Sequence, residues 1–258
     1  MKRRLLAASL YMVCLSTAPA ADRVADAQTS VARNVLTETG VKGGLVVHLG
    51  CGDGTMTGNL RINERYLVHG LDRDAQKVAE ARRHIQSLGL YGAVSVDVWE
   101  GKALPYTDNL VNLIIAEEGA TVDTQELMRV LAPHGVACVK TADGWTKTIK
   151  AWPREMGQWT HSRQGPGNNP VAADTLVGPP RGLQWSCEPL WLRSHEITSS
   201  FNAMVSAQGR VFYILDEAPT GIAQDAVPEQ WTLIARDAFN GVLLWKQPLS
   251  PWGVKAWK

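Results

Sequence analysis

Residues 46–54, "VVHLGCGDG", join an apolar run to three glycines at alternate positions. An apolar run that stops at glycines is typical of a buried strand ending in a tight turn. Glycine at positions 50, 52 and 54 lets the backbone turn sharply and approach a ligand where a Cβ atom would collide. The residues after the turn can present amide groups at the start of a helix. The stretch therefore predicts a strand, a ligand-binding loop and a helix in that order.

A second apolar run, "RYLVHGLD" at residues 65–72, ends in Asp72, which lies 22 residues after Gly50. A carboxylate about 20 residues after the first glycine, at the end of the second strand, is placed to accept hydrogen bonds from ribose hydroxyls. A nicotinamide dinucleotide fingerprint would have its third small residue at position 55, where this chain has Thr55. The spacing indicates a nucleoside-containing ligand but matches nicotinamide binding poorly.

Apolar runs alternate with helical periods from about residue 24 to residue 141. This alternation predicts an α/β domain whose parallel sheet is covered on both faces. Helices are expected over Val24–Glu38 and Asp74–Leu88, since apolar residues recur there at three- and four-residue intervals. Asp74 can cap the second helix, and Gly89 can end it.

Two further stretches extend this pattern, "SVDVWEGKALPYTDNLVNLIIAEEG" at 95–119 and "ELMRVLAPHGVACV" at 126–139. With the glycine loop and Asp72, they make residues 41–141 resemble the class I S-adenosylmethionine-dependent methyltransferases. The resemblance implies a Rossmann-like sheet and S-adenosyl-L-methionine as cofactor. It also implies that residues 126–139 form a helix, a Pro-Gly-type turn at 132–135 and the fifth strand. It assigns the methionine part of the cofactor to the loop, the ribose to Asp72, the adenine to the end of the third strand, and the acceptor side to Glu117, the candidate catalytic residue. The implied cofactor-binding residues are His48, Gly50, Cys51, Gly52, Gly54, Asp72, Asp97 and Val98.

Two features depart from the family pattern. The family usually has an acidic residue two positions before the first glycine, whereas this chain has His48, which offers no permanent negative charge to the cofactor's ammonium group. Two interpretations of His48 remain, a residue beside the cofactor and a histidine of the core. The sheet is also expected to stop after its fifth strand, without the final hairpin of the family.

The C-terminal part has a β pattern that includes "LIARDAFNGVLLWK" at 233–246. Ala235, Asp237, Gly241 and Trp245 resemble the repeat of pyrroloquinoline-quinone-type β-propellers, and a generic hairpin with a buried tryptophan is the alternative. A propeller closes with 4 to 8 blades, and residues 196–258 suffice for about one. We therefore expect the chain to be either the N-terminal part of a longer propeller protein or a product truncated by a frameshift. The whole resembles large exported bacterial proteins that join both kinds of domain.

Four segments follow from this pattern. Residues 1–21 are expected to be a signal peptide, 22–144 the methyltransferase-like domain, 145–195 a connector rich in tryptophan, proline and glycine, and 196–258 the partial propeller. Tryptophan and histidine combine apolar packing with one hydrogen bond, so the connector's tryptophans, with His161 and His195, are expected to dock the two domains.

The N-terminus has Lys2, Arg3 and Arg4, an apolar run over 5–15, and then "APAA". This order is typical of a cleaved signal peptide, and the apolar run is shorter than the roughly 20 residues that span a bilayer. The expected location is periplasmic or extracellular, or cytoplasmic if the signal is not functional. The net charge of +1 excludes a strong electrostatic footprint for nucleic acid. The spacing of the cysteines predicts no metal site.

Three functions are compatible with these patterns. The first is an enzyme that transfers a methyl group from S-adenosylmethionine to an unknown small acceptor. The second is a non-catalytic exported binding or scaffold protein with a degenerate methyltransferase-like domain, since a fold alone does not fix a function. The third, a quinone-dependent dehydrogenase, is disfavoured because one blade cannot enclose a cofactor on a propeller axis.

Overall fold

The computed structural model describes residues 20–176, 178, 182–189, 200–219 and 227–249, and side chains within this part from Thr29 onward. Residues 1–19 of the predicted signal peptide, His195 and residues 250–258 lie outside the described residues. Within the described part, no helix is long and apolar enough to cross a membrane.

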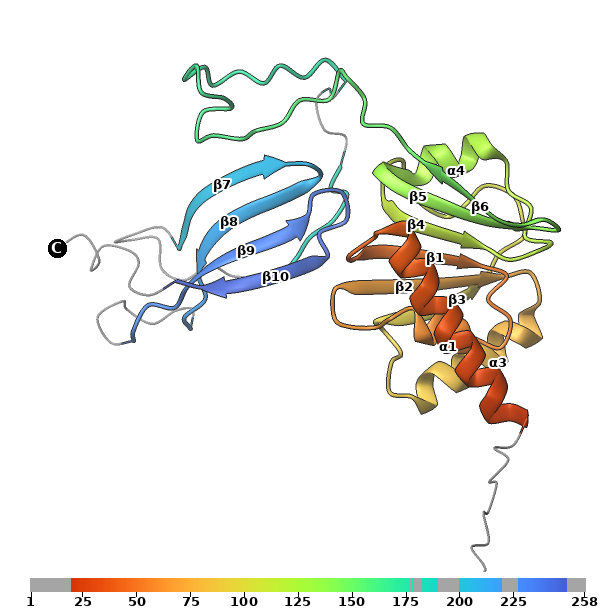
Figure 1. The fold of residues 1–258 in the computed structure, drawn as a ribbon. Coiled ribbons are helices and arrows are strands. Elements are labelled where there is room, and N and C mark those ends of the chain that lie inside the picture. The colour runs from red at the N-terminus through yellow and green to blue at the C-terminus, as the bar shows by residue number, and fades with distance from the viewer. Residues whose placement is uncertain (1–19, 177, 179–181, 190–199, 220–226, 250–258) are drawn as a thin grey trace, which may run out of the picture.

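The N-terminal domain contains a six-stranded sheet with the order β3-β2-β1-β4-β5-β6 (Figure 1). Strands β1 to β5 are parallel, and β6 pairs with β5 in the antiparallel direction. The strands are β1 (Gly44–Leu49), β2 (Tyr66–Asp72), β3 (Val94–Val98), β4 (Val111–Ala116), β5 (Leu131–Thr141) and β6 (Gly144–Ile149). The helices are α1 (Ala20–Thr39), α2 (Thr55–Asn59), α3 (Ala75–Ser87) and α4 (Thr124–Val130).

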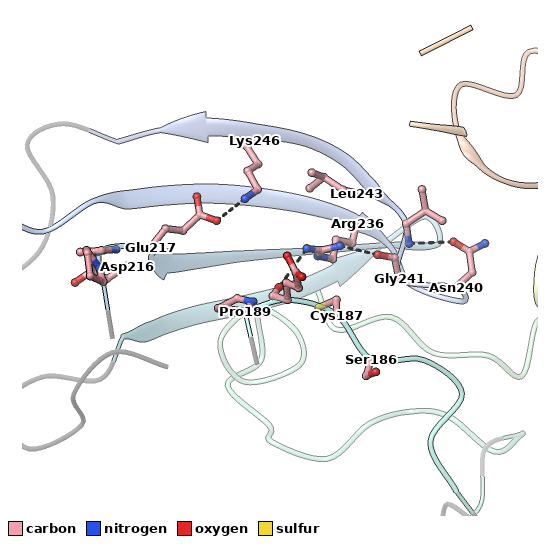
Figure 2. A pocket seen from close by; sticks show the side chains of 14 residues that line it. Ser186, Cys187, Pro189, Asp216, Glu217, Arg236, Asn240, Gly241, Leu243 and Lys246 are labelled. Atoms are coloured by element: carbon pink, nitrogen blue, oxygen red, sulfur yellow. Dashed lines mark hydrogen bonds and ion pairs between the residues drawn. The ribbon is translucent and has the colours of Figure 1, made fainter. Parts of the chain in front are cut away.

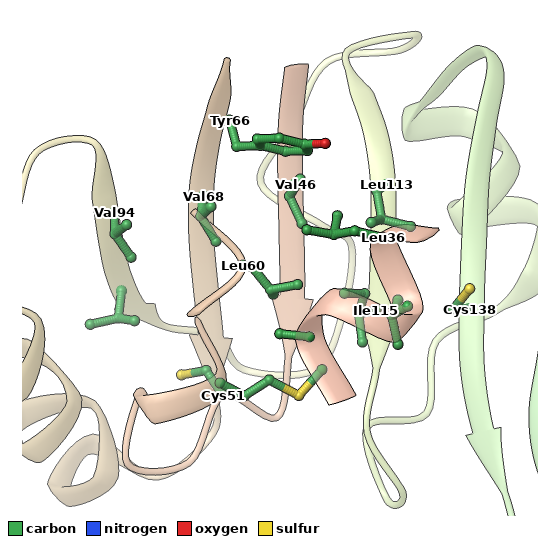
Figure 3. Packing of buried hydrophobic residues seen from close by; sticks show 14 of the residues in the cluster. Leu36, Val46, Cys51, Leu60, Tyr66, Val68, Val94, Leu113, Ile115 and Cys138 are labelled. Carbon is green, nitrogen blue, oxygen red and sulfur yellow. The ribbon is translucent and has the colours of Figure 1, made fainter. Parts of the chain in front are cut away.

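Helices cover both faces of this sheet, as the apolar runs predicted. On one face, α1, α2 and α3 bury a cluster against alternate residues of the strands (Figure 3). On the other face, α4 and the segment that contains Trp99 and Leu104 cover a second cluster. Strand β1 is buried along its whole length because both clusters draw on its residues. The central strand therefore holds the glycine loop on a rigid base.

The local signals at α3 act as predicted. Asp74 lies before the first turn, and its Oδ1 accepts hydrogen bonds from the backbone N–H groups of Gln76 and Lys77. The helix ends at Ser87, and Gly89 has φ of 68°, which suits a residue without a Cβ atom. The buried residues of α3 are Val78, Ala81 and Ile85, on the face that the period indicated.

Two expectations for the end of the domain are wrong. The sheet continues past the fifth strand, because β6 pairs with β5 from Thr141↔Gly144 to Val136↔Ile149. Every residue of β6 is exposed, so the strand lacks the alternation by which sequence analysis finds strands. The turn predicted at residues 132–135 lies inside β5, where His134 has φ of 65° and the pairing with β4 shifts register.

The C-terminal part forms a four-stranded antiparallel sheet with the order β10-β9-β8-β7 (Figure 1). Its strands are β7 (Phe201–Ala207), β8 (Arg210–Asp216), β9 (Trp231–Asp237) and β10 (Leu243–Pro248). The turn between β9 and β10 is built around Asp237, whose Oδ1 accepts hydrogen bonds from the N–H groups of Phe239 and Asn240. Gly241 has φ of 73°, and a Cβ atom there would lie 2.4 Å from the ring of Trp185.

This turn joins the second sheet to the first through three polar side chains. Asn112, at the start of β4, donates to Asp237 Oδ2 over 2.7 Å and accepts from Asn240 Nδ2 over 2.6 Å. Asn240 also donates to the carbonyl of Leu110. Asn112 and Leu110 lie at the amino ends of the parallel strands, so the second sheet contacts the edge opposite the glycine loop.

Two tryptophans of the predicted connector contact the same turn. The ring centroid of Trp152 lies 5.4 Å from that of His134 and 6.2 Å from that of Phe239. Trp185 Nε1 donates to the carbonyl of Ala238. His161 instead lies 2.8 Å from Thr160 Oγ1 in an exposed position, so its side chain takes no part in this junction.

Replacing Asn112 with alanine should lower the free energy of unfolding by about 2 kcal/mol, because the N–H of Leu45 and one oxygen of Asp237 would lose their partner. Burial already raises the pKa of Asp237, so its carboxylate depends on these donors. Urea unfolding followed by tryptophan fluorescence measures the loss. Asn202→Ala, at an exposed position of β7, is the matched control. An equal loss in both variants would contradict the role of Asn112.

Candidate functional site

The glycine loop folds back on the neighbouring strand. The N–H groups of Gly50 and Cys51 both donate to the carbonyl of Leu71, over 2.8 and 3.2 Å. Gly50, Gly52 and Gly54 all have positive φ, between 54° and 82°, in the left-handed region that other residues rarely adopt. A Cβ atom at Gly54 would lie 2.8 Å from that of Ala81, so this glycine also lets α3 pack against the loop. The backbone of the loop therefore favours glycine at all three positions.

Asp72 fixes the loop to the end of β2. Its Oδ2 accepts a hydrogen bond from the N–H of Gly52 over 3.0 Å, and its Oδ1 accepts one from the N–H of Asp74 over 3.0 Å. Each carboxylate oxygen has a second lone pair, so Asp72 can still accept from a ligand's hydroxyl groups. Asp72 and the glycine loop, the two parts of the predicted nucleoside site, are therefore in direct contact.

A hollow of about 270 Å³ opens at this carboxyl edge of the sheet. Its lining comes from the glycine loop, the end of β2, the first turn of α3, the residue after β3 and the turn after β4. The lining residues are Gly50, Gly52, Asp72, Arg73, Lys77, Trp99, Glu117, Glu118, Gly119 and Ala120. Backbone at the first two glycines, a carboxylate and an aromatic ring together fit a nucleoside joined to a charged group.

Four of the nine residues proposed from the sequence line this hollow, namely Gly50, Gly52, Asp72 and Glu117. Gly54 lies against α3 instead. Cys51 is in the core beneath the loop, where burial raises the pKa of its thiol to about 12 and keeps it protonated. Its side chain faces Gly70, not the hollow.

Asp97 and Val98 lie at the edge strand β3, outside the lining of this hollow. His69 Nε2 lies 3.1 Å from Asp97 Oδ2, and Arg82 forms an ion pair with Asp97 Oδ1. The carboxylate that the family resemblance assigned to the adenine is therefore paired within the protein. The Val98 side chain is half exposed.

Sequence analysis missed Arg73, Lys77 and Trp99, which also line the hollow. The guanidinium carbon of Arg73 lies 5.6 Å from the centroid of the Trp99 ring, in cation–π geometry. Trp99 Nε1 donates to the carbonyl of Ala103, which fixes the ring. The position of Trp99, directly after a predicted strand at the carboxyl edge of a parallel sheet, is the signal that could have found it.

His48 lies beneath the loop in β1 and is 2% exposed. Its Nδ1 lies 2.8 Å from Thr57 Oγ1, and its Nε2 lies 3.8 Å from Glu117 Oε1. Glu117 Oε2 accepts a hydrogen bond from Lys140 Nζ over 3.0 Å. His48 thus belongs to the core and is not among the residues that line the hollow, although its Nε2 faces the carboxylate of Glu117.

A second hollow of about 110 Å³ adjoins the first across the turn after β4. Glu117, Gly119 and Ala120 line both hollows. The remaining lining is mainly apolar and includes Val122, Leu127 and Val139. A small molecule seated there would lie beside whatever occupies the first hollow.

Larger hollows lie away from this edge. One of about 500 Å³ lies between the two sheets, beside Asn112 and Asp237. Another of about 660 Å³ lies on the second sheet, where Lys246 forms an ion pair with Glu217 and Arg236 donates to the carbonyl of Gly241 (Figure 2). Among the described residues no three histidine, cysteine, aspartate or glutamate side chains are grouped as metal ligands would be.

Residues 46–135 match a family described as "Methyltransferase domain". This segment contains the glycine loop, Asp72 and Glu117. No curated protein matches the chain.

Similar solved structures include an S-adenosylmethionine-dependent methyltransferase from Aquifex aeolicus, with 26% identity and a TM-score of 0.38, where the match covers 42% of this chain and 62% of that one. A provisionally assigned enzyme of the same kind from Methanococcus maripaludis has 18% identity and a TM-score of 0.41. That match covers 46% of this chain and 59% of the other. The chain thus spans less than two thirds of these structures. Since these TM-scores are below 0.5, we draw neither activity nor substrate from them.

Proposed function

We propose that the chain binds S-adenosylmethionine in the 270 Å³ hollow and transfers its methyl group to a small acceptor. The proposal starts from the match of residues 46–135 to a methyltransferase domain, a class of domain whose cofactor is S-adenosylmethionine. The observation that carries the proposal is the contact between Asp72 and the N–H of Gly52 beside Gly50. It brings a ribose-binding carboxylate and a backbone cradle to one wall of one hollow.

The residues of the chain have separate tasks in this proposal. Gly50 and Gly52 leave room for the amino-acid part of the cofactor, Asp72 accepts hydrogen bonds from the ribose, and Trp99 offers an apolar face to the adenine. When bound, the cofactor supplies a methyl group activated by a sulfonium ion. Gly50, Gly52, Asp72 and Trp99 would hold the cofactor in the first hollow, beside the adjoining one that shares Glu117, Gly119 and Ala120. Alignment of the two reactants is the main contribution of the protein.

The adjoining 110 Å³ hollow is our candidate for the acceptor site. It lies next to Glu117 and has apolar walls from Val122, Leu127 and Val139, so an acceptor with a small apolar group fits it best. The second sheet lies at the opposite edge of the domain and supplies no lining residue to either hollow. Within the described residues, the acceptor site is therefore built by the N-terminal domain alone.

Isothermal titration of S-adenosylmethionine and S-adenosylhomocysteine into the purified chain tests the proposal. We expect one site with a micromolar Kd for each compound. Nicotinamide adenine dinucleotide is the control ligand, and it should not compete. Absence of binding by protein that shows a cooperative unfolding transition would overturn the proposal and leave the non-catalytic binding or scaffold role.

The family resemblance of the C-terminal part supports a second, structural proposal. We propose that β7 to β10 form one blade of a pyrroloquinoline-quinone-type propeller, with further blades from a longer chain. Asp237 and Gly241 shape the β9–β10 turn, and the Trp245 ring lies 6.0 Å from that of Phe212. A longer chain that includes the further blades should show a higher unfolding temperature for this sheet, since blades bury their faces against each other.

Export also remains a proposal. A cleaved signal peptide would place the mature chain outside the cytoplasm, away from the metabolite pool that supplies the cofactor. N-terminal sequencing of protein expressed with its signal tests this. A new N-terminus near Ala21 supports export, and an intact Met1 in cytoplasmic protein contradicts it.

A further inference from the structure

A carboxylate is absent from the place where the family usually provides one. Position 48 holds a histidine that is 2% exposed, and its Nε2 is buried without a hydrogen-bond partner among the described residues. Its Nδ1 is engaged with Thr57 Oγ1, so the ring is fixed. A buried polar atom without a hydrogen-bond partner is energetically unfavourable. The Nε2 atom of His48 therefore has a hydrogen-bonding position that no described side chain fills. The nearest carboxylate oxygen to this nitrogen is Glu117 Oε1, at 3.8 Å.

Glu117 reaches this place from the neighbouring strand. It is the first residue after β4, and its N–H continues the β1–β4 pairing by donating to the carbonyl of Leu49 over 3.0 Å. Its own carbonyl accepts from the N–H of Ala120 over 3.0 Å, which fixes the turn. A Cβ atom built on Gly50 would lie 3.3 Å from the Cβ of Glu117. The side chain of Glu117 therefore starts directly beside the first glycine of the loop.

The charge state of Glu117 suits it to binding a cation better than to accepting a proton. The neighbouring His48 and Lys140 lower the pKa of the Glu117 carboxyl, whereas burial raises it. The net effect is a pKa below the ordinary value. Glu117 is therefore a carboxylate at neutral pH and a weak base, since a general base works best with a pKa near the working pH. Lys140 Nζ binds Oε2, so Oε1, on the His48 side, keeps lone pairs for a cation.

We propose that Glu117 binds the α-ammonium group of the cofactor's methionine part, and that Lys140 positions its carboxylate. The negative charge that faces the ammonium group thus comes from the residue after β4, whereas the family usually supplies it from β1, the neighbouring parallel strand. This inference rests on the proposed function and replaces the catalytic role that the family resemblance assigned to Glu117.

Two probes separate this role from a general effect on the site. S-Adenosylhomocysteine contains the amino-acid group, whereas 5′-methylthioadenosine contains the adenosine and the thioether without it. Titration of both into the wild-type chain and into Glu117→Gln should show S-adenosylhomocysteine binding weakened about tenfold or more, because a charge-assisted hydrogen bond is lost. Binding of 5′-methylthioadenosine should change less than about twofold, because Asp72 and Trp99 hold it.

Three further variants complete the experiment. Glu117→Asp keeps the charge and should recover part of the lost affinity for S-adenosylhomocysteine. Glu64→Gln removes an exposed carboxylate outside the lining of the hollow and should leave both affinities unchanged. Asp72→Asn should weaken both compounds, since both carry the ribose.

Each outcome has a definite meaning. An equal loss of both compounds in Glu117→Gln, or no loss of either, would overturn the inference while the proposed cofactor site stands. Binding of neither compound by the folded wild-type chain would overturn the proposed function itself. Selective loss of the compound with the amino-acid group, with rescue by aspartate, would support the inference.

Discussion

Asp72→Ala should weaken the binding of S-adenosylhomocysteine at least about 100-fold. Asp72 is expected to accept hydrogen bonds from two ribose hydroxyl groups, and each hydrogen bond to a charged group contributes about 1.5–3 kcal/mol. The same carboxylate also anchors the N–H of Gly52, so its loss frees the loop that forms the cradle. Isothermal titration measures the change directly, and circular dichroism checks that the variant is folded.

The neighbouring carboxylate Asp53 provides the matched control. Asp53 is exposed and lies in the same loop, where its Oδ1 accepts only the N–H of Thr55 among the described contacts. Asp53→Ala should therefore change the affinity far less than Asp72→Ala. Similar affinities of the wild type and Asp72→Ala would exclude Asp72 as the ribose-binding residue and leave the loop geometry as its only role.

Gly54→Val should lower the free energy of unfolding by about 2–5 kcal/mol. Gly54 has φ of 82°, a conformation that costs a residue with a side chain about 1–2 kcal/mol. A Cβ atom there would also lie 2.8 Å from the Cβ and 3.0 Å from the Cα of Ala81, so α3 would have to move away from the loop. Forced overpacking adds about 1–3 kcal/mol. Urea denaturation measures the change.

Gly89→Val separates the two causes of this loss. Gly89 has φ of 68°, and a Cβ atom there would meet nothing within 4 Å. This variant has the backbone strain without the collision, so it should lose about 1–2 kcal/mol. If Gly54→Val were no less stable than Gly89→Val, the contact between the loop and α3 would not be tight in solution.

Most of the N-terminal domain could be predicted from the sequence because its elements have strong local signals. The parallel strands are mostly apolar, and α3 has both a capping aspartate and a terminating glycine. Strand β6 was missed because none of its residues is buried, so its pairing with β5 depends on backbone hydrogen bonds that the sequence does not reveal. The turn at residues 132–135 was misplaced because a positive φ at His134 absorbs the irregularity inside a strand.

The site could be predicted where a residue's role depends on the backbone, and less well where it depends on side-chain direction. Gly50, Gly52 and Asp72 lie together because strand ends in a parallel sheet meet at one edge. Asp97 lies at the end of its predicted strand, but its carboxylate pairs with His69 and Arg82 at the sheet's edge. No local pattern reveals such a pairing, since His69 is 28 residues away in sequence.

The second sheet is attached at the amino ends of the parallel strands, and the glycine loop lies at their carboxyl ends. The length of β1 therefore separates the Asn112 junction from the loop. Six residues of strand span about 20 Å, which exceeds the range over which substitutions normally influence one another. The glycine loop and the Asn112 junction can therefore accumulate changes independently during evolution. The loop can be adapted to a different ligand, or lose its ligand, without any change in how the C-terminal sheet is attached.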